Sequence, residues 1–125
     1  MNLVKKQRPR KTEAQVHKIE VGCGHLYVTI GKDKGDLIEI FTTLGKAGGC
    51  AMSQLEALSR SVSLGLKFGI PVEEYIKEFE NIRCPSPALS PTEVLETMEE
   101  VRSCADAIAK VLKRETERGV VNDKA

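Results

Sequence analysis

The sequence predicts an α+β domain, in which a small antiparallel β-sheet of about three strands is followed by three α-helices. Residues 16–43 alternate polar and apolar side chains with the period of two that half-buried strands show. From about residue 50 onwards, apolar residues recur instead at intervals of three and four, which is the helical period. A chain of 125 residues is long enough for one domain with one hydrophobic core.

The three strands are expected in the first third of the chain. Residues 16–30 predict two short strands, which the glycines around Cys23 interrupt. A polar turn at residues 31–36 leads into a third strand over residues 37–43, rich in β-branched and aromatic side chains. The third strand is expected to pair with the second as a hairpin.

The first two helices are predicted from apolar spacing and from their end signals. An apolar stripe over residues 50–68 indicates a long amphipathic helix, which Gly69 ends. Pro71 suits the first turn of a second helix, which is expected to end near Asn81. The connector that follows, Cys84 to Pro87, is expected to be extended because its prolines disfavour helix.

The third helix is predicted to begin at Pro91 and to end near Arg118. Ser90 and Glu93 have the spacing of a capping box, and proline is favoured at the first helical position. Gly119 is expected to stop the helix. The apolar residues behind this prediction recur at three/four spacing: Val94, Met98, Val101, Ala105, Ile108 and Leu112.

Composition and charge divide the chain into three expected parts. Residues 1–15 are basic and poor in apolar side chains, which indicates a flexible arm; a nucleic-acid-binding arm is the alternative. Residues 16–118 form the folded domain, and residues 119–125 a disordered tail. The net charge of +1 gives no general attraction to nucleic acid or membrane, and no apolar run approaches a transmembrane length. Without a secretory signal, the expected location is the cytoplasm, where thiols stay free or bind metal.

Four cysteines are the main candidates for chemistry, and none belongs to a C-x-x-C pair. Cys23 lies between two glycines, Cys50 follows two glycines at a helix start, and Cys84 precedes a proline. The N-terminus of a helix would stabilise the thiolate of Cys50. Cys104, in contrast, neighbours an apolar stripe and can be a small core residue. Three interpretations stay open: a shared metal site holding zinc or an iron–sulfur cluster, unconnected cysteines, and redox-active thiols.

The glycine-rich turn before the first helix is a second candidate site. Backbone N–H groups of such a turn can bind phosphate, and Lys46 adds a positive charge beside Gly48 and Gly49. A tight turn that simply leads into the helix explains the same residues. No Walker loop, G-x-S-x-G or H-E-x-x-H motif is present, so the residues describe no complete catalytic site.

Several stretches, in order, resemble the TSCPD domain at the C-terminal end of class II, adenosylcobalamin-dependent ribonucleotide reductases. The resemblance covers residues 8–113, and the name motif reads Arg102-Ser103-Cys104-Ala105-Asp106 in place of Thr-Ser-Cys-Pro-Asp. The stretches that carry it are Gly22 to Thr29, Gly45 to Ala51, Glu56 to Arg60, Ser63 to Leu66, Ile82 to Pro87 and Ser103 to Lys110. All four cysteines fall on motif positions, which implies one four-cysteine metal site with zinc favoured.

The resemblance implies a part of an enzyme rather than a whole one. We expect a stand-alone TSCPD module that serves ribonucleotide reduction as an accessory metal-binding domain. Adenosylcobalamin would be bound by the partner, the catalytic chain of the reductase; the catalytic barrel is missing here, so independent activity is not expected. The alternatives are a thiol relay that re-reduces the reductase, with Cys50 as nucleophile, and a non-enzymatic regulator binding nucleotide or nucleic acid through the turn and the basic arm. The sequence does not determine the oligomeric state.

Overall fold

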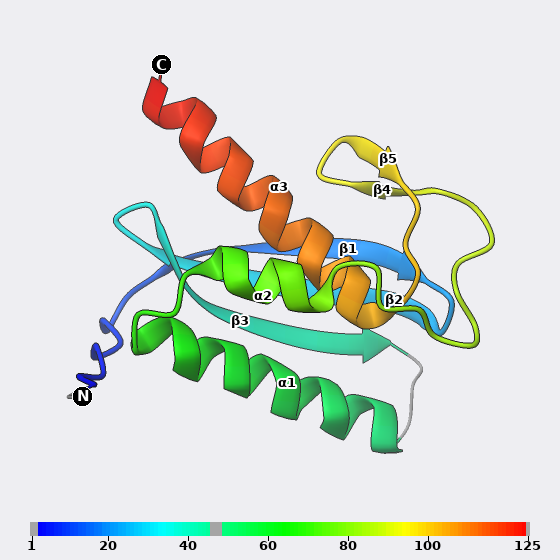
Figure 1. Cartoon of the computed structure of the whole chain (residues 1–125), viewed down its shortest axis with the longest axis horizontal. Helices are drawn as coiled ribbons and strands as arrows, with labels where there is room; N and C mark the ends of the chain where they lie inside the picture. The colour runs from blue at the N-terminus through cyan, green and yellow to red at the C-terminus, as the bar shows by residue number, and fades with distance from the viewer. Residues whose placement is uncertain (1–2, 46–48, 125) are drawn as a thin grey trace.

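The computed structural model describes residues 3–45 and 49–124, with side chains described up to residue 117 (Figure 1). Three antiparallel strands form the sheet, in the order β1 (Glu13–Val21), β2 (Gly24–Asp33) and β3 (Asp36–Gly45). The helices are α1 (Gly49–Lys67), α2 (Val72–Phe79) and α3 (Cys104–Lys124). The predicted α+β class is therefore confirmed, a three-stranded sheet followed by helices.

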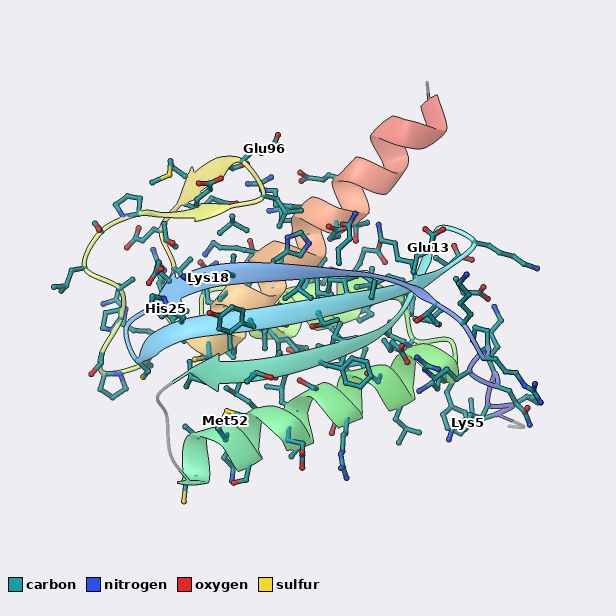
Figure 2. The ribbon with its side chains drawn as sticks, turned by 180° about the vertical axis from the view of Figure 1, so that it is seen from behind. Lys5, Glu13, Lys18, His25, Met52 and Glu96 are labelled. Carbon is teal, nitrogen blue, oxygen red and sulfur yellow. The ribbon has the colours of Figure 1, made fainter. Side chains whose placement is uncertain are left out.

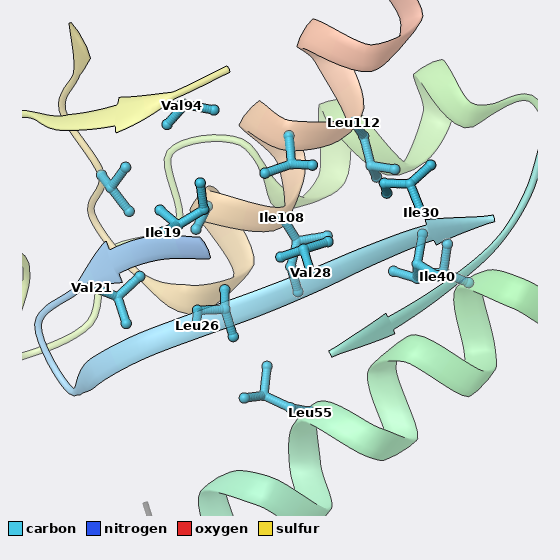
Figure 3. Packing of buried hydrophobic residues seen from close by; sticks show 14 of the residues in the cluster. Ile19, Val21, Leu26, Val28, Ile30, Ile40, Leu55, Val94, Ile108 and Leu112 are labelled. Atoms are coloured by element: carbon cyan, nitrogen blue, oxygen red, sulfur yellow. The ribbon is translucent and has the colours of Figure 1, made fainter. Parts of the chain in front are cut away.

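The core lies between one face of the sheet and the helices. Leu26, Val28 and Ile30 alternate along β2 and are fully buried. The register pairs Leu26 with Ile19 on β1 and with Leu44 on β3, so one face of all three strands is apolar. Figure 3 shows α3 crossing this face, and Leu55 of α1 pointing into the same cluster. Aliphatic packing explains how a chain with few aromatic residues fills its core.

Helix α1 lies along β3, one of the two outer strands of the sheet. The hydroxyl of Ser63 accepts a hydrogen bond from the backbone nitrogen of Ile40 and donates one to its carbonyl, both at 3.0 Å. The hydroxyls of Thr42 and Ser59 lie 2.6 Å apart, in a second buried contact between the two elements. An outer strand carries unpaired backbone groups, and α1 satisfies part of them here.

The predicted start of the third helix is wrong. Residues 92–99 instead form a hairpin of two short strands, β4 (Thr92–Val94) and β5 (Thr97–Glu99). Its turn places Leu95 and Glu96 at positive φ angles, which no helix accommodates. The predicted apolar stripe fails at Met98, which is exposed on β5, whereas Val94 is buried where β4 lies against β1.

Helix α3 begins at Cys104, with a different capping box from the predicted one. The hydroxyl of Ser103 accepts a hydrogen bond from the backbone nitrogen of Asp106 at 3.0 Å. The carboxylate of Asp106 reaches back to accept from the backbone nitrogen of Arg102 at 2.8 Å. Two neighbouring segments each offered a Ser-x-x-acid pattern, and only the second caps a helix. The helix also continues through Gly119 to Lys124, beyond the predicted end.

The N-terminal segment contacts the domain before the first strand begins. The guanidinium of Arg8 donates two hydrogen bonds, of 2.7 and 3.0 Å, to the carboxylate of Glu39, whose side chain is 3% exposed. The backbone nitrogen of Lys6 donates to the carbonyl of Lys67 at 2.9 Å. The boundaries of the arm, the domain and the tail stay predictions. Within the described residues, no helix combines the length and apolar character needed to cross a membrane.

Candidate functional site

The cysteine-bearing segments meet at one end of the molecule. Figure 1 shows the β1–β2 turn, the end of β3 and the starts of α1 and α3 at this end. Cys23 lies in the β1–β2 turn, Cys84 in the connector after α2, and Cys104 at the first position of α3. Cys50 is the second residue of α1. All four are free thiols; Cys23 and Cys50 are exposed, and Cys84 and Cys104 are partly buried.

Gly22 lets the β1–β2 turn pack directly on the connector. A Cβ atom at this position would overlap the backbone carbonyl of Ser86 and meet the backbone of Pro87. Only glycine fits so close an approach of two backbones. Because Gly22 precedes Cys23 and Ser86 follows Cys84, this contact holds the two cysteine-bearing segments together.

Asp106 fixes the positions of the other two segments. Its carboxylate accepts hydrogen bonds from the backbone nitrogens of Asn81 and Arg102, each at 2.8 Å, and from the amine of Lys110 at 2.6 Å. The backbone nitrogen of Cys84 in turn donates to the carbonyl of Arg102 at 3.0 Å. The connector and the start of α3 are thereby joined around one buried carboxylate. Burial alone would raise the pKa of Asp106, but these three donors hold it below its ordinary value.

The surroundings of Cys104 shift the pKa of its thiol. Burial and, to a smaller extent, the negative charges of the Cys23 and Cys84 thiolates together raise its pKa to about 11. These three thiols are therefore close enough to interact electrostatically. The contact of Gly22 with Ser86 and the hydrogen bond from Cys84 to Arg102 bring together the segments that carry Cys23, Cys84 and Cys104, and Cys50 lies at the start of α1.

The donor chemistry of this end suits zinc, but the ligand shell is incomplete. Thiolates are the donors that structural zinc and iron–sulfur sites prefer. Within the described part of the chain, no group of three or more His, Cys, Asp or Glu side chains is arranged to hold a metal ion. His25, two residues after Cys23, adds a nitrogen donor: its buried Nδ1 lies 2.8 Å from the carboxylate of Glu20 without hydrogen-bond geometry to any described group.

The predicted phosphate site falls mainly outside the described residues. Lys46 and Gly48 belong to the segment that the structure does not describe. Gly49 is exposed at a positive φ of 50°, with open space around it, as a turn before a helix requires. Phosphate binding there stays a prediction.

Sequence reasoning missed the role of Asp106. The signal was present as the Ser103-x-x-Asp106 spacing, but the similar pattern at Ser90 drew the helix start upstream. The hydrogen bond from the backbone nitrogen of Asn81 to Asp106 could not be predicted from a local pattern, because Asn81 lies far from Asp106 in the sequence.

The fold defines a small α+β domain, with the segments that carry its cysteines at one end. The family model described as "TSCPD domain" matches residues 3–116, and the chain belongs to this family. The expectation drawn from the resemblance is thus confirmed for the family. In structural terms, the serine and the aspartate of the name motif are the two capping residues of α3, and its cysteine is Cys104.

The curated relatives are vitamin B12-dependent ribonucleotide reductases. The protein of Streptantibioticus cattleyicolor is 32% identical over 81 residues, which is 64% of this chain and 14% of that protein. The protein of Streptomyces clavuligerus matches equally well over 8% of its length. That of Bradyrhizobium diazoefficiens is 33% identical over 76 residues, or 60% of this chain and 6% of its own. The chain therefore spans a small fraction of these relatives. Comparison with solved structures found no match.

Proposed function

We propose that this TSCPD domain serves the adenosylcobalamin-dependent reduction of ribonucleotides as an accessory, metal-binding module. Its curated relatives carry the matching region within vitamin B12-dependent ribonucleotide reductases. The module would act in the cytoplasm by docking on the catalytic chain, which binds the cobalamin and performs the reduction.

The observation that supports the metal-binding part is the contact between the backbone segments that carry Cys23, Cys84 and Cys104. These segments are far apart in the sequence. The close packing of Gly22 and the hydrogen bonds of the Asp106 carboxylate hold them together. A fold that gathers three thiols at its surface end without pairing them as disulfides suits a structural metal. Cys50 is the fourth ligand that the family resemblance implies, and zinc is the metal we propose.

Elemental analysis of the purified, untagged chain tests the metal site. We expect one zinc per chain and thiols that react with a chromogenic disulfide only after unfolding. Single Cys→Ser variants at positions 23, 84 and 104 should lose the metal, and Cys50→Ser decides whether Cys50 is a ligand. Ser61→Ala, whose exposed hydroxyl donates to the carbonyl of Ala57 further along α1, serves as the control that keeps it. A metal-free chain with reactive native thiols contradicts the proposal.

A thiol relay is the second candidate, favoured by the exposure of Cys23 and Cys50. One thiolate would attack a disulfide of the catalytic chain, and a second thiol would resolve the mixed disulfide. The partner would gain two thiols while this chain gains one disulfide. Cys50, exposed at the start of α1, is the nucleophile that we propose for this step. Rapid native labelling of both thiols in a metal-free chain favours the relay.

The association with the reductase has its own test. A reductase catalytic chain that lacks this domain is assayed for deoxyribonucleotide formation with and without the purified 125-residue chain. We expect added activity and a stable complex on size-exclusion chromatography. Zinc binding without any interaction with a reductase chain would leave the metal site in place and contradict the docking.

A further inference from the structure

The face of the sheet turned away from α2 and α3 carries apolar side chains where polar ones are expected. Figure 2 looks onto this outer face, with Lys18 and His25 labelled on it and α1 running beside β3. In an antiparallel sheet with one solvated face, outward residues are usually polar. Here Val16 is 63% exposed, Phe41 53% and Tyr27 36%. No described helix or loop covers these side chains.

The two aromatic rings come from neighbouring strands on the same face. Thr29 on β2 pairs with Phe41 on β3, and Tyr27 pairs with Thr43, so the two rings occupy adjacent cross-strand rows. Lys18 pairs with Tyr27 from the other side. Diagonal neighbours on adjacent strands are within reach of aromatic side chains. The sheet therefore presents a platform of two rings with threonines between them and a lysine at its margin.

A groove of about 450 Å³ continues this platform between β3 and α1. Phe41 and Thr43 line it from the sheet, and Arg60, Leu64 and Lys67 line it from the helix. Arg60 and Lys67 are seven residues apart, which places them roughly 10 Å apart along one helix wall. The floor holds the Ser59 and Ser63 hydroxyls that already join α1 to β3.

The side chains that line the groove carry two carboxylates, Glu39 and Glu56, and two cations, Arg60 and Lys67, and Arg8 adds a third cation beside Glu39. Its two carboxylates are engaged by cations: Glu39 accepts both hydrogen bonds of Arg8, and Glu56 lies 3.7 Å from Arg60. Lys67 and, on the open face, Lys18 are the cations that exceed these pairs. Exposed rings beside a cationic wall are complementary to a polyanion whose units carry flat faces. A protein partner would be expected to meet a larger aliphatic patch with less charge.

We propose that this platform and groove bind single-stranded nucleic acid, with bases stacked on Phe41 and Tyr27 and phosphates held by Lys67 and Lys18. The surface differs from the basic arm and the glycine turn that the sequence suggested. None of its side chains is a thiol, so we expect binding without the metal and without the reductase. Stacking accepts any base, so we expect little sequence preference.

Fluorescence anisotropy of the full chain with labelled oligothymidylate and oligouridylate of about twelve nucleotides tests the proposal. Phe41→Leu, which keeps apolar volume but removes the ring, should weaken binding by about 5-fold or more, and Phe41→Tyr should not. Tyr27→Leu and Tyr27→Phe form the second matched pair. Lys67→Gln should reduce the slope of log affinity against log salt by about 0.7. Met98→Ala, exposed on the β4–β5 hairpin, is the control without effect.

Four outcomes overturn the proposal. The first is absence of binding at protein concentrations of about 100 μM in low salt. The second is equal affinity of the wild type and Phe41→Leu, which would show that the ring is not needed. The third is equal affinity for duplex DNA, whose bases are not free to stack on side chains. The fourth is self-association that Phe41→Ala abolishes without any oligonucleotide binding, which would assign the face to a second copy of the chain. Circular dichroism confirms that each variant folds.

Discussion

The carboxylate of Asp106 accepts a hydrogen bond of 2.8 Å from the backbone nitrogen of Asn81, twenty-five residues earlier in the chain. Asn81 has a positive φ of 67° at the point where the chain leaves α2 for the connector that carries Cys84. Asp106 also caps the helix that begins at Cys104. One buried side chain therefore sets the spacing between two of the candidate ligands.

Replacing Asp106 with Asn should lower the free energy of unfolding at pH 7 by about 2 to 4 kcal/mol, since the amide cannot accept from both backbone donors and Lys110. The folded-state pKa of Asp106 is lowered, so its stabilisation is complete above the unfolded pKa of about 3.9 and is lost as the pH falls through the folded value. Urea unfolding from pH 7 to pH 3 should show the difference from wild type shrinking below about pH 4.

The exposed carboxylate of Glu100, in the loop between β5 and α3, supplies the control for this measurement. Its oxygen lies 3.9 Å from the guanidinium of Arg102, and exposed pairs of this kind contribute little. Glu100→Gln should change stability by less than about 0.5 kcal/mol. A difference between wild type and Asp106→Asn that stays constant down to pH 3 would contradict the assigned pKa direction.

Gly22→Ala should disturb the thiol end more than any other glycine substitution in the sheet. The added methyl group would overlap the backbone of Ser86, so the β1–β2 turn and the connector must separate. We expect loss of bound zinc and earlier reaction of Cys23 and Cys84 with a thiol reagent. Gly45→Ala is the matched control, because the added Cβ atom would lie 3.6 Å from the carbonyl oxygen of His25, an ordinary contact distance. Unchanged metal content in Gly22→Ala would argue against a site formed across this contact.

Glu115 joins α3 to the sheet through a buried ion pair. Its carboxylate lies 2.8 Å from the amine of Lys32 and 2.8 Å from the Nε2 atom of His17, and its side chain is 1% exposed. Burial would raise its pKa, but Lys32 and His17 lower it below the ordinary value. A double-mutant cycle with Glu115→Gln and Lys32→Gln should give a coupling energy of about 1 to 3 kcal/mol.

The exposed pair of Arg60 and Glu56 provides the comparison, at 3.7 Å on the surface of α1. Its cycle should give less than about 0.5 kcal/mol, because water and salt screen exposed charges. Equal coupling in the two cycles would mean that burial does not strengthen the Glu115 contact.

Ser63→Ala should lower the unfolding free energy by about 1 to 3 kcal/mol, because it leaves the backbone nitrogen of Ile40 without its partner in a buried position. Ser61, two residues earlier on the exposed side of α1, donates only to the carbonyl of Ala57. Ser61→Ala should therefore be neutral or slightly stabilising, since alanine favours helix. Thermal unfolding of both variants checks the pair, and similar effects would refute the role of Ser63 at the edge of β3.

The sequence by itself determined the elements whose signals are local. The alternation of Leu26, Val28 and Ile30 predicted β2, because side chains of a strand alternate between two faces wherever the strand is placed. The apolar stripe of α1 and the glycine after it predicted that helix in the same way. The motif stretches also identified the family, because the cysteines and their neighbours are recognisable without a fold.

Only the tertiary structure decided between competing local patterns and between possible neighbours. Ser90 and Ser103 both begin plausible capping boxes, and the burial of Val94 against β1 selects a hairpin at the first. Four widely spaced cysteines permit many groupings, and only tertiary contacts place the segments of Cys23 and Cys84 side by side, through Gly22 and Ser86. The outward placement of Tyr27 and Phe41 on one open face likewise depends on strand register. Such choices rest on contacts between residues distant in the chain, whose free energies local patterns do not contain.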